Sequence, residues 1–153
     1  MTYEEFVRRW DALSSRKRDV WVAEAVLGCR VVYVRALEGC RLVDAGRGEL
    51  EPVLAEVPCL EEHGAAASLA CLPEAEYVLN VVPCYTAEIA AAWEVVECLR
   101  RRFGAVSIEV GGAPEEPSCR VAVGGCVAEG KAVPEAVARA ALLAACVGDV
   151  RDG

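Results

Sequence analysis

Residues 84–97 read CYTAEIAAAWEVVE, and this stretch decides how the second half of the chain folds. Thr86 is a preferred helix N-cap residue, and Glu88 follows in the first turn, where the helix dipole favours negative charge. Apolar residues then recur at spacings of four, three and three, which predicts a helix over 86–102 with one apolar stripe facing the core. The predicted inward stripe consists of Ile89, Trp93, Val96 and Leu99.

A second stretch, PEAVARAALLA at residues 134–144, predicts the last helix, over 134–147. Pro134 suits the first helical position, where its missing N–H costs nothing. The small residues that follow permit close packing against a sheet or another helix. Between the two helices, β-forming residues and glycine pairs predict an antiparallel sheet. Its strands are expected at 105–110, 119–123 and 126–129, with turns at 111–117 and 124–125.

The N-terminal part predicts two helices and a strand. Phe6, Trp10 and Leu13 lie on one face of a helix over 3–13. Ser15 is the expected cap of a second helix over 16–27, in which Val20, Ala23 and Leu27 point inward. Trp21 lies off that apolar line, so it is predicted to be partly exposed and is the candidate interface residue. The strand is expected at 30–37.

These elements describe a single domain over residues 1–153. Residues 1–37 hold the N-terminal helices and the first strand, and residues 77–147 hold a strand at 77–82, a helix, a β-hairpin and the last helix. Residues 38–76 are interrupted by glycine and proline, which predicts an elaborated loop region with a short strand near 53–57 and a helical turn at 65–72. The fold class is therefore α+β with a small, mainly antiparallel sheet. Helices 86–102 and 134–147 are expected on one face of that sheet.

The composition bounds the class of protein. A chain of 153 residues with 55% hydrophobic residues can bury a substantial core in one domain. No apolar run reaches the roughly 18 to 20 residues that span a bilayer. Residues 1–11 form a polar amphipathic stretch without the apolar centre of a signal peptide. The expected location is the cytoplasm.

The formal net charge of −8 argues against broad nucleic-acid affinity, which depends on neutralising phosphates. Two basic clusters stand out: Arg16, Lys17 and Arg18 at the start of the second helix, and Arg100–Arg102 at the end of a later one. The first is the better candidate site for a small anion, because helix N-termini also attract negative charge. The second is already explained by the dipole at a helix C-terminus. A solvated surface of mixed charge is the simpler explanation of both clusters.

Nine cysteines are many for this length, and an odd number cannot pair completely within one chain. None of them is in C-x-x-C spacing, and several stand where a small apolar residue would fit. The pattern favours reduced, buried cysteines over scattered metal ligands or one or two disulfides. No metal site is predicted.

The sequence contains no set of residues typical of catalysis. It has no G-x-S-x-G, P-loop or G-x-G-x-x-G motif. His63 is the only histidine and stands in an acidic loop, so a nucleophilic cysteine would lack a base. We therefore expect a protein that is not an enzyme, with no catalytic residues and no cofactor.

Three stretches together resemble one family. Residues 85–97 and 134–143, with DVWVAEAVLG at 19–28, are similar to the phage ABA sandwich domain, a group of small phage and prophage proteins. The resemblance covers roughly residues 10–35 and 80–145 and leaves out 38–76. Cys29 stands where that family usually has an aromatic residue. The resemblance implies an α/β/α layered sandwich and a phage or prophage setting, and it implies no active residues.

Three functions remain open at this stage. The first is a non-enzymatic phage accessory protein that binds a protein partner or itself as a homo-oligomer, through Trp21 and the alanine-rich last helix. The second sequesters a small anionic ligand, such as a nucleotide signal of antiviral defence, through Arg16, Lys17 and Arg18. The third is a divergent RNA-binding module, since helix–strand–strand–strand–helix is also the order of a double-stranded-RNA-binding domain. That module needs lysines where Pro134 and Glu135 stand here, so nucleic acid is the least favoured partner.

Overall fold

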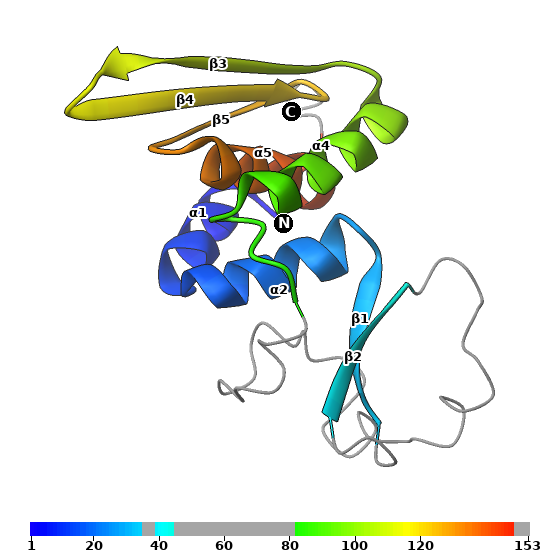
Figure 1. The fold of residues 1–153 in the computed structure, drawn as a ribbon. Helices are drawn as coiled ribbons and strands as arrows, with labels where there is room; N and C mark the ends of the chain where they lie inside the picture. Colours follow the sequence, from blue (N-terminus) through cyan, green and yellow to red (C-terminus); the bar gives the residue numbers. More distant parts are fainter. Residues whose placement is uncertain (35–38, 45–81, 149–153) are drawn as a thin grey trace.

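The computed structural model describes residues 1–34, 39–44 and 82–148 (Figure 1). Its elements confirm the α+β class with a small antiparallel sheet, and from residue 86 onward the predicted order of helix, three strands and helix is also confirmed. The elements are α1 (Tyr3–Ala12), α2 (Ser15–Ala25), β1 (Cys29–Val34), β2 (Gly39–Asp44), α4 (Ile89–Phe103), β3 (Val106–Ala113), β4 (Glu116–Val123), β5 (Cys126–Gly130) and α5 (Val133–Cys146).

The described elements are layered (Figure 1). Strands β3, β4 and β5 form an antiparallel sheet in that order. Helices α4 and α5 lie side by side against one face of this sheet, as predicted. Helices α1 and α2 pack on the far side of α5. Within the described residues, the outer face of the sheet is open to solvent, and its exposed side chains include Ser107, Glu109, Arg120, Val127 and Glu129.

Helix α5 is the centre of the core. It contacts β4 and β5 on one side and α2 and α4 on others, so almost every residue from Pro134 to Ala144 is buried. A helix that is apolar all round is a buried helix, and its alanines let four neighbours approach closely. The prediction that this helix offers a surface for self-association is therefore wrong.

The β-hairpins differ from the prediction in length. The turn at Gly124 and Gly125 has φ of 55° and 80°, the left-handed pair that a two-residue hairpin needs. Strands β3 and β4 run further than expected, because residues 111–117 form strand and turn together: Gly112 pairs with Pro117. Proline is tolerated there because β5 pairs with β4 only from Cys119 onward, so no strand on that side needs its N–H.

The region that was predicted to be an irregular loop contains a strand. Strand β2 pairs antiparallel with β1, with Val34 opposite Gly39 and Cys29 opposite Asp44. The sequence pattern missed it because a two-stranded ribbon is defined by its partner more than by its own periodicity. The elements expected at 53–57, 65–72 and 77–81, and the last residues of the strand expected at 30–37, lie outside the described residues.

Helix α4 has a different buried face from the predicted one. Ile89 and Trp93 are 65% and 55% exposed, so the prediction that they point inward is wrong. Val96 and Leu99 are buried as expected, but the rest of the inner face is Ala91, Ala92 and Val95. Small residues allow α4 to lie close against the alanine-rich α5, and this close contact turns the large side chains away.

Candidate functional site: the Asp19 clamp and the outer face of α4

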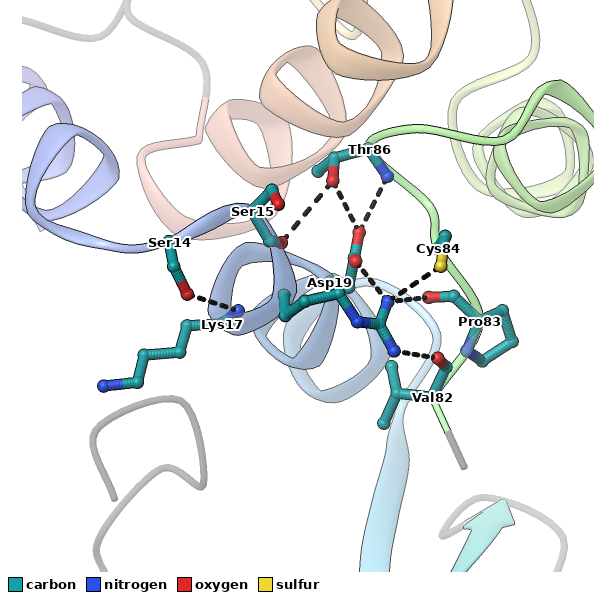
Figure 2. A network of polar contacts seen from close by, with 9 residues as sticks. Ser14, Ser15, Lys17, Asp19, Val82, Pro83, Cys84 and Thr86 are labelled. Atoms are coloured by element: carbon teal, nitrogen blue, oxygen red, sulfur yellow. Dashed lines mark hydrogen bonds and ion pairs between the residues drawn. The ribbon is translucent and has the colours of Figure 1, made fainter. Parts of the chain in front are cut away.

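Helix α2 places a charged pair on one side of its first turns. Ser14, one residue earlier than predicted, is the N-cap, and its hydroxyl accepts a hydrogen bond from the Lys17 N–H at 3.4 Å. Arg16 and Asp19 then lie three residues apart, the spacing at which side chains on a helix meet. Both point toward residues 82–86, which precede α4 (Figure 2).

Asp19 is fully buried, with 0% of its surface exposed. One carboxylate oxygen, Oδ1, accepts hydrogen bonds from the Thr86 backbone N–H at 2.7 Å and from the Thr86 hydroxyl at 2.8 Å. The other oxygen, Oδ2, lies 2.5 Å from Nη1 of Arg16. Every oxygen of this carboxylate therefore has a partner within the chain, as a buried charge requires.

Arg16 extends the same network to the backbone. Its Nη2 donates to the carbonyl oxygen of Val82 at 2.5 Å, and its Nη1 approaches the Pro83 carbonyl oxygen at 3.4 Å and the Cys84 sulfur at 3.2 Å. Residues 82–86 precede α4 without strand or helix ladders of their own, and Arg16 supplies donors to the carbonyls of Val82 and Pro83. The Pro83 carbonyl also accepts a hydrogen bond from the Tyr85 N–H at 3.0 Å. Together Arg16, Asp19 and Thr86 form what we call the Asp19 clamp (Figure 2).

The clamp is suited to holding structure. Burial raises the pKa of the Asp19 carboxyl, and the hydrogen bonds from Thr86 and from Arg16 act in the opposite direction. A general acid or base must reach a substrate proton, whereas this carboxylate faces only groups of its own chain. Thr86, the predicted cap, is not the N-cap of α4. Its hydroxyl is bound to Asp19, and the helix begins three residues later, after Glu88, without a side-chain cap.

The three residues of the predicted anion site do not converge. Arg16 belongs to the clamp. The side chain of Lys17 points away from Asp19 (Figure 2). Arg18 donates from Nε to the Trp10 carbonyl oxygen at 2.9 Å, lies 4.5 Å above the Trp10 ring and pairs with Glu135 at 3.9 Å. Two of the three cations thus have partners inside the fold, and anion binding by this cluster stays a prediction.

Trp21 is a core residue. It is only 3% exposed, so the prediction that it is partly exposed is wrong, and its proposed interface role loses its basis. Its ring centroid lies 5.5 Å from that of Phe6, and the Arg9 guanidinium lies 4.3 Å above it. Trp21 lies off the predicted apolar line of α2, but it is buried because α1 covers one side of α2 and α5 covers another. A broad part of the surface of α2 is therefore in contact with other helices. Phe6 and Trp10 are buried as predicted.

The outer face of α4 is the apolar surface that the prediction missed. We use this name for the solvent-facing residues Ile89, Ala90, Trp93 and Glu94 together with Glu97 and the arginines that follow. Ile89 and Trp93 are four residues apart and therefore adjacent on the helix. Glu97 pairs with Arg100 at 3.7 Å along the same line, and Arg102 lies 5.2 Å from the Phe103 ring.

Six cysteines that the structure describes are thiols and not disulfides, and they are buried or half-buried: Cys29, Cys84, Cys98, Cys119, Cys126 and Cys146. Burial raises the pKa of the Cys119 and Cys146 thiols, which keeps them protonated and weakly nucleophilic. Across residues 1–34, 39–44 and 82–148, no three His, Cys, Asp or Glu side chains gather closely enough to hold a metal ion. In the same ranges, every helix is too short or too polar to cross a lipid bilayer. His63 lies outside these ranges.

Sequence reasoning overlooked Asp19, although one signal pointed to it. Its carboxylate directly precedes the apolar run Val20–Ala23, and residues 19–23 are all buried. A charged residue at the start of a fully buried run, with a cation three positions before it, indicates a buried ion pair. Its distant partner, Thr86, could not be read from sequence.

Comparison with known proteins shows a family relationship. Neither the curated proteins nor the solved structures contain a match to this chain. The family model for the phage ABA sandwich domain matches residues 20–142. The match begins in α2, ends in α5 and so contains both partners of the α4–α5 contact and the whole three-stranded sheet. The resemblance seen in the sequence is confirmed, and the chain belongs to the phage ABA sandwich domain family.

Proposed function

We propose that this chain is a non-enzymatic accessory protein of a phage or prophage, that it acts in the cytoplasm by binding, and that the outer face of α4 is the surface it uses. The observation that carries the proposal is the exposure of Trp93 and Ile89 beside each other on a helix whose inner face is already complete. Tryptophan is the residue most enriched among those that dominate binding energy in protein interfaces.

Burial elsewhere supports the choice of this face. The other tryptophans, Trp10 and Trp21, are inside the core, and so is the alanine-rich α5. The remaining large apolar side chains that are exposed in the described residues are Met1, Tyr3, Val110 and Val127. Val127 stands on the outer face of the sheet among charged neighbours, whereas Ile89 and Trp93 form a continuous pair. An exposed pair of this size marks an interaction site more often than an isolated residue does.

The test is crosslinking at defined positions in cells. A photo-reactive amino acid at Ala90, beside Trp93, is expected to give a discrete covalent adduct, and the same amino acid at Val127 is expected to give none. Introducing Trp93→Glu into the chain that carries the photo-reactive amino acid at position 90 should remove the adduct. No adduct at position 90, or the same adduct from both positions, would reject this surface. Turnover of a nucleotide by the purified chain would reject the non-enzymatic part.

A further inference from the structure

We infer that the outer face of α4 binds a second copy of this chain, with the two α4 helices antiparallel about a twofold axis. This inference rests on the proposed function and names the partner for the same surface. Two features of the helix favour this partner: the distribution of charge along it and the identity of its exposed apolar residues.

Acidic residues precede basic ones along α4. Glu88 is its N-cap, Glu94 and Glu97 stand in its middle, and Arg100, Arg101 and Arg102 stand in its last turn. These six charges sum to zero, while the whole chain carries −8. This stretch is therefore locally neutral, and two copies can meet on it without net repulsion.

The order of the charges selects the antiparallel arrangement. If two α4 helices lay parallel, arginines would face arginines and glutamates would face glutamates. In the antiparallel arrangement, the acidic part of each helix faces the basic end of the other. A twofold axis repeats this contact between the acidic part of one helix and the basic end of the other, with the same residues on both copies. This repetition is the property of an isologous dimer interface.

The apolar residues fit the same arrangement. Ile89, Trp93, Glu97 and Arg100 follow one another at spacings of four, four and three, so they form a line on the helix surface. Antiparallel pairing therefore places Trp93 of one copy close to the arginines of the other. Arginine stems cover apolar surface while their guanidinium groups stack on aromatic rings. In the single chain, Trp93 is 55% exposed and the Arg100 side chain is 61% exposed, so both are accessible.

The contact is small, so the dimer is expected to be weak. One helix face buries less than the roughly 1,200 Å² of total area at which stable interfaces begin. We expect sedimentation equilibrium of the full chain to show a monomer–dimer equilibrium in the micromolar range. Trp93→Glu should shift the chain to monomer throughout that range, and Val127→Glu, the matched control on the sheet, should leave the equilibrium unchanged.

Charge reversal tests whether these charged residues hold the two copies together. A chain with Glu94→Arg and Glu97→Arg, and a second chain with Arg100→Glu and Arg101→Glu, should each be monomeric alone. Mixed together they should form a heterodimer, because each then presents the charge that the other lacks. All these residues are exposed or half-buried, so circular dichroism and melting should show folded variants.

The outcomes separate the inference from the proposal on which it rests. A chain that stays monomeric while its position 90 crosslinks to a different protein overturns self-association and leaves the binding function in place. A dimer that survives Trp93→Glu, or variants that fail to pair when mixed, also overturns this inference. A monomer that forms no adduct at position 90 removes both.

Discussion

At the scale of single residues, two charged side chains organise the packing of helix α2 against the segment before α4. Asp19 and Arg16 join helix α2 to residues 82–86, which are separated from Asp19 by as many as 67 positions in sequence. The basic character of residues 16–18, which suggested a ligand site, is largely used inside the molecule. Arg16 holds backbone carbonyls, and Arg18 covers Trp10.

The first prediction concerns Arg16→Met, which keeps the aliphatic stem and removes the charge. This substitution leaves the buried Asp19 carboxylate without its counter-ion. We expect the free energy of unfolding at neutral pH to fall by about 2–4 kcal/mol. This loss is near the low end for a broken buried ion pair, because Arg16 is partly exposed. Chemical denaturation measures this. Lys17→Met, whose side chain points away from the clamp, is the control and should change little.

The same variant has a defined pH dependence. Burial raises the pKa of Asp19, and Arg16 opposes this rise, so removing Arg16 raises the folded-state pKa further above the unfolded value. Between those two values the folded chain binds more protons than the unfolded chain, and the free energy of unfolding therefore increases as the pH falls. The deficit of Arg16→Met relative to the native chain should shrink from neutral toward mildly acidic pH. A deficit that grows as the pH falls would contradict this account.

At the scale of elements, local backbone preference and tertiary contacts both determine the conformation at helix and strand ends. In the β4–β5 turn these two requirements coincide. Gly124 has the left-handed φ of 55° that the turn needs, and it also lies against α4, because a Cβ built there would be 2.8 Å from Cδ1 of Phe103. The turn therefore fixes the end of α4 relative to the sheet.

The second prediction compares two glycines. Gly28→Ala places alanine at a φ of 67° with no atom within 4 Å of the new Cβ, so it should cost only the backbone strain, about 1 kcal/mol. Gly124→Ala adds the clash with the Phe103 ring and should cost about 2–4 kcal/mol in all. Thermal or urea unfolding of the two variants measures the difference. Equal losses would show that Phe103 does not press on the turn.

At the scale of the whole molecule, the core is a stack in which α5 is enclosed by the sheet, α4 and the N-terminal helices. Small side chains fill this interior, and cysteine serves in it as another small apolar residue. Cys119 and Cys126 face α5 from the sheet and are buried.

The third prediction follows from that role. The chain has nine cysteines, and titration of thiols in denaturant should find close to nine free groups per chain. In the native state, Cys119 and Cys126 should react slowly because they are buried. Free thiols in fewer than half of the cysteines, or zinc in stoichiometric amount in the purified protein, would contradict it.

The sequence by itself determined the elements whose signals are local. Proline at a helix start, glycine pairs in turns and apolar periodicity predicted α1, α2, α4, α5 and the three-stranded sheet, and they placed Phe6 and Trp10 in the core. The family was also recognisable from short stretches of sequence. For the functional surface the sequence predicted the wrong residues, since Trp21 is buried and Trp93 is exposed.

Only the tertiary structure decided which faces meet. The spacing of Ile89, Trp93, Val96 and Leu99 describes a stripe, but a helix can be rotated by tens of degrees to suit its neighbour, and α4 turns its alanines toward α5. Thr86 had the chemistry of a cap and became a partner of Asp19, to which its hydroxyl and its backbone N–H both donate, and the helix begins only at Ile89. Strand β2 formed because β1 was there to pair with it. For α4 and for Thr86 the deciding partner lies far away in the sequence, where local patterns carry no information.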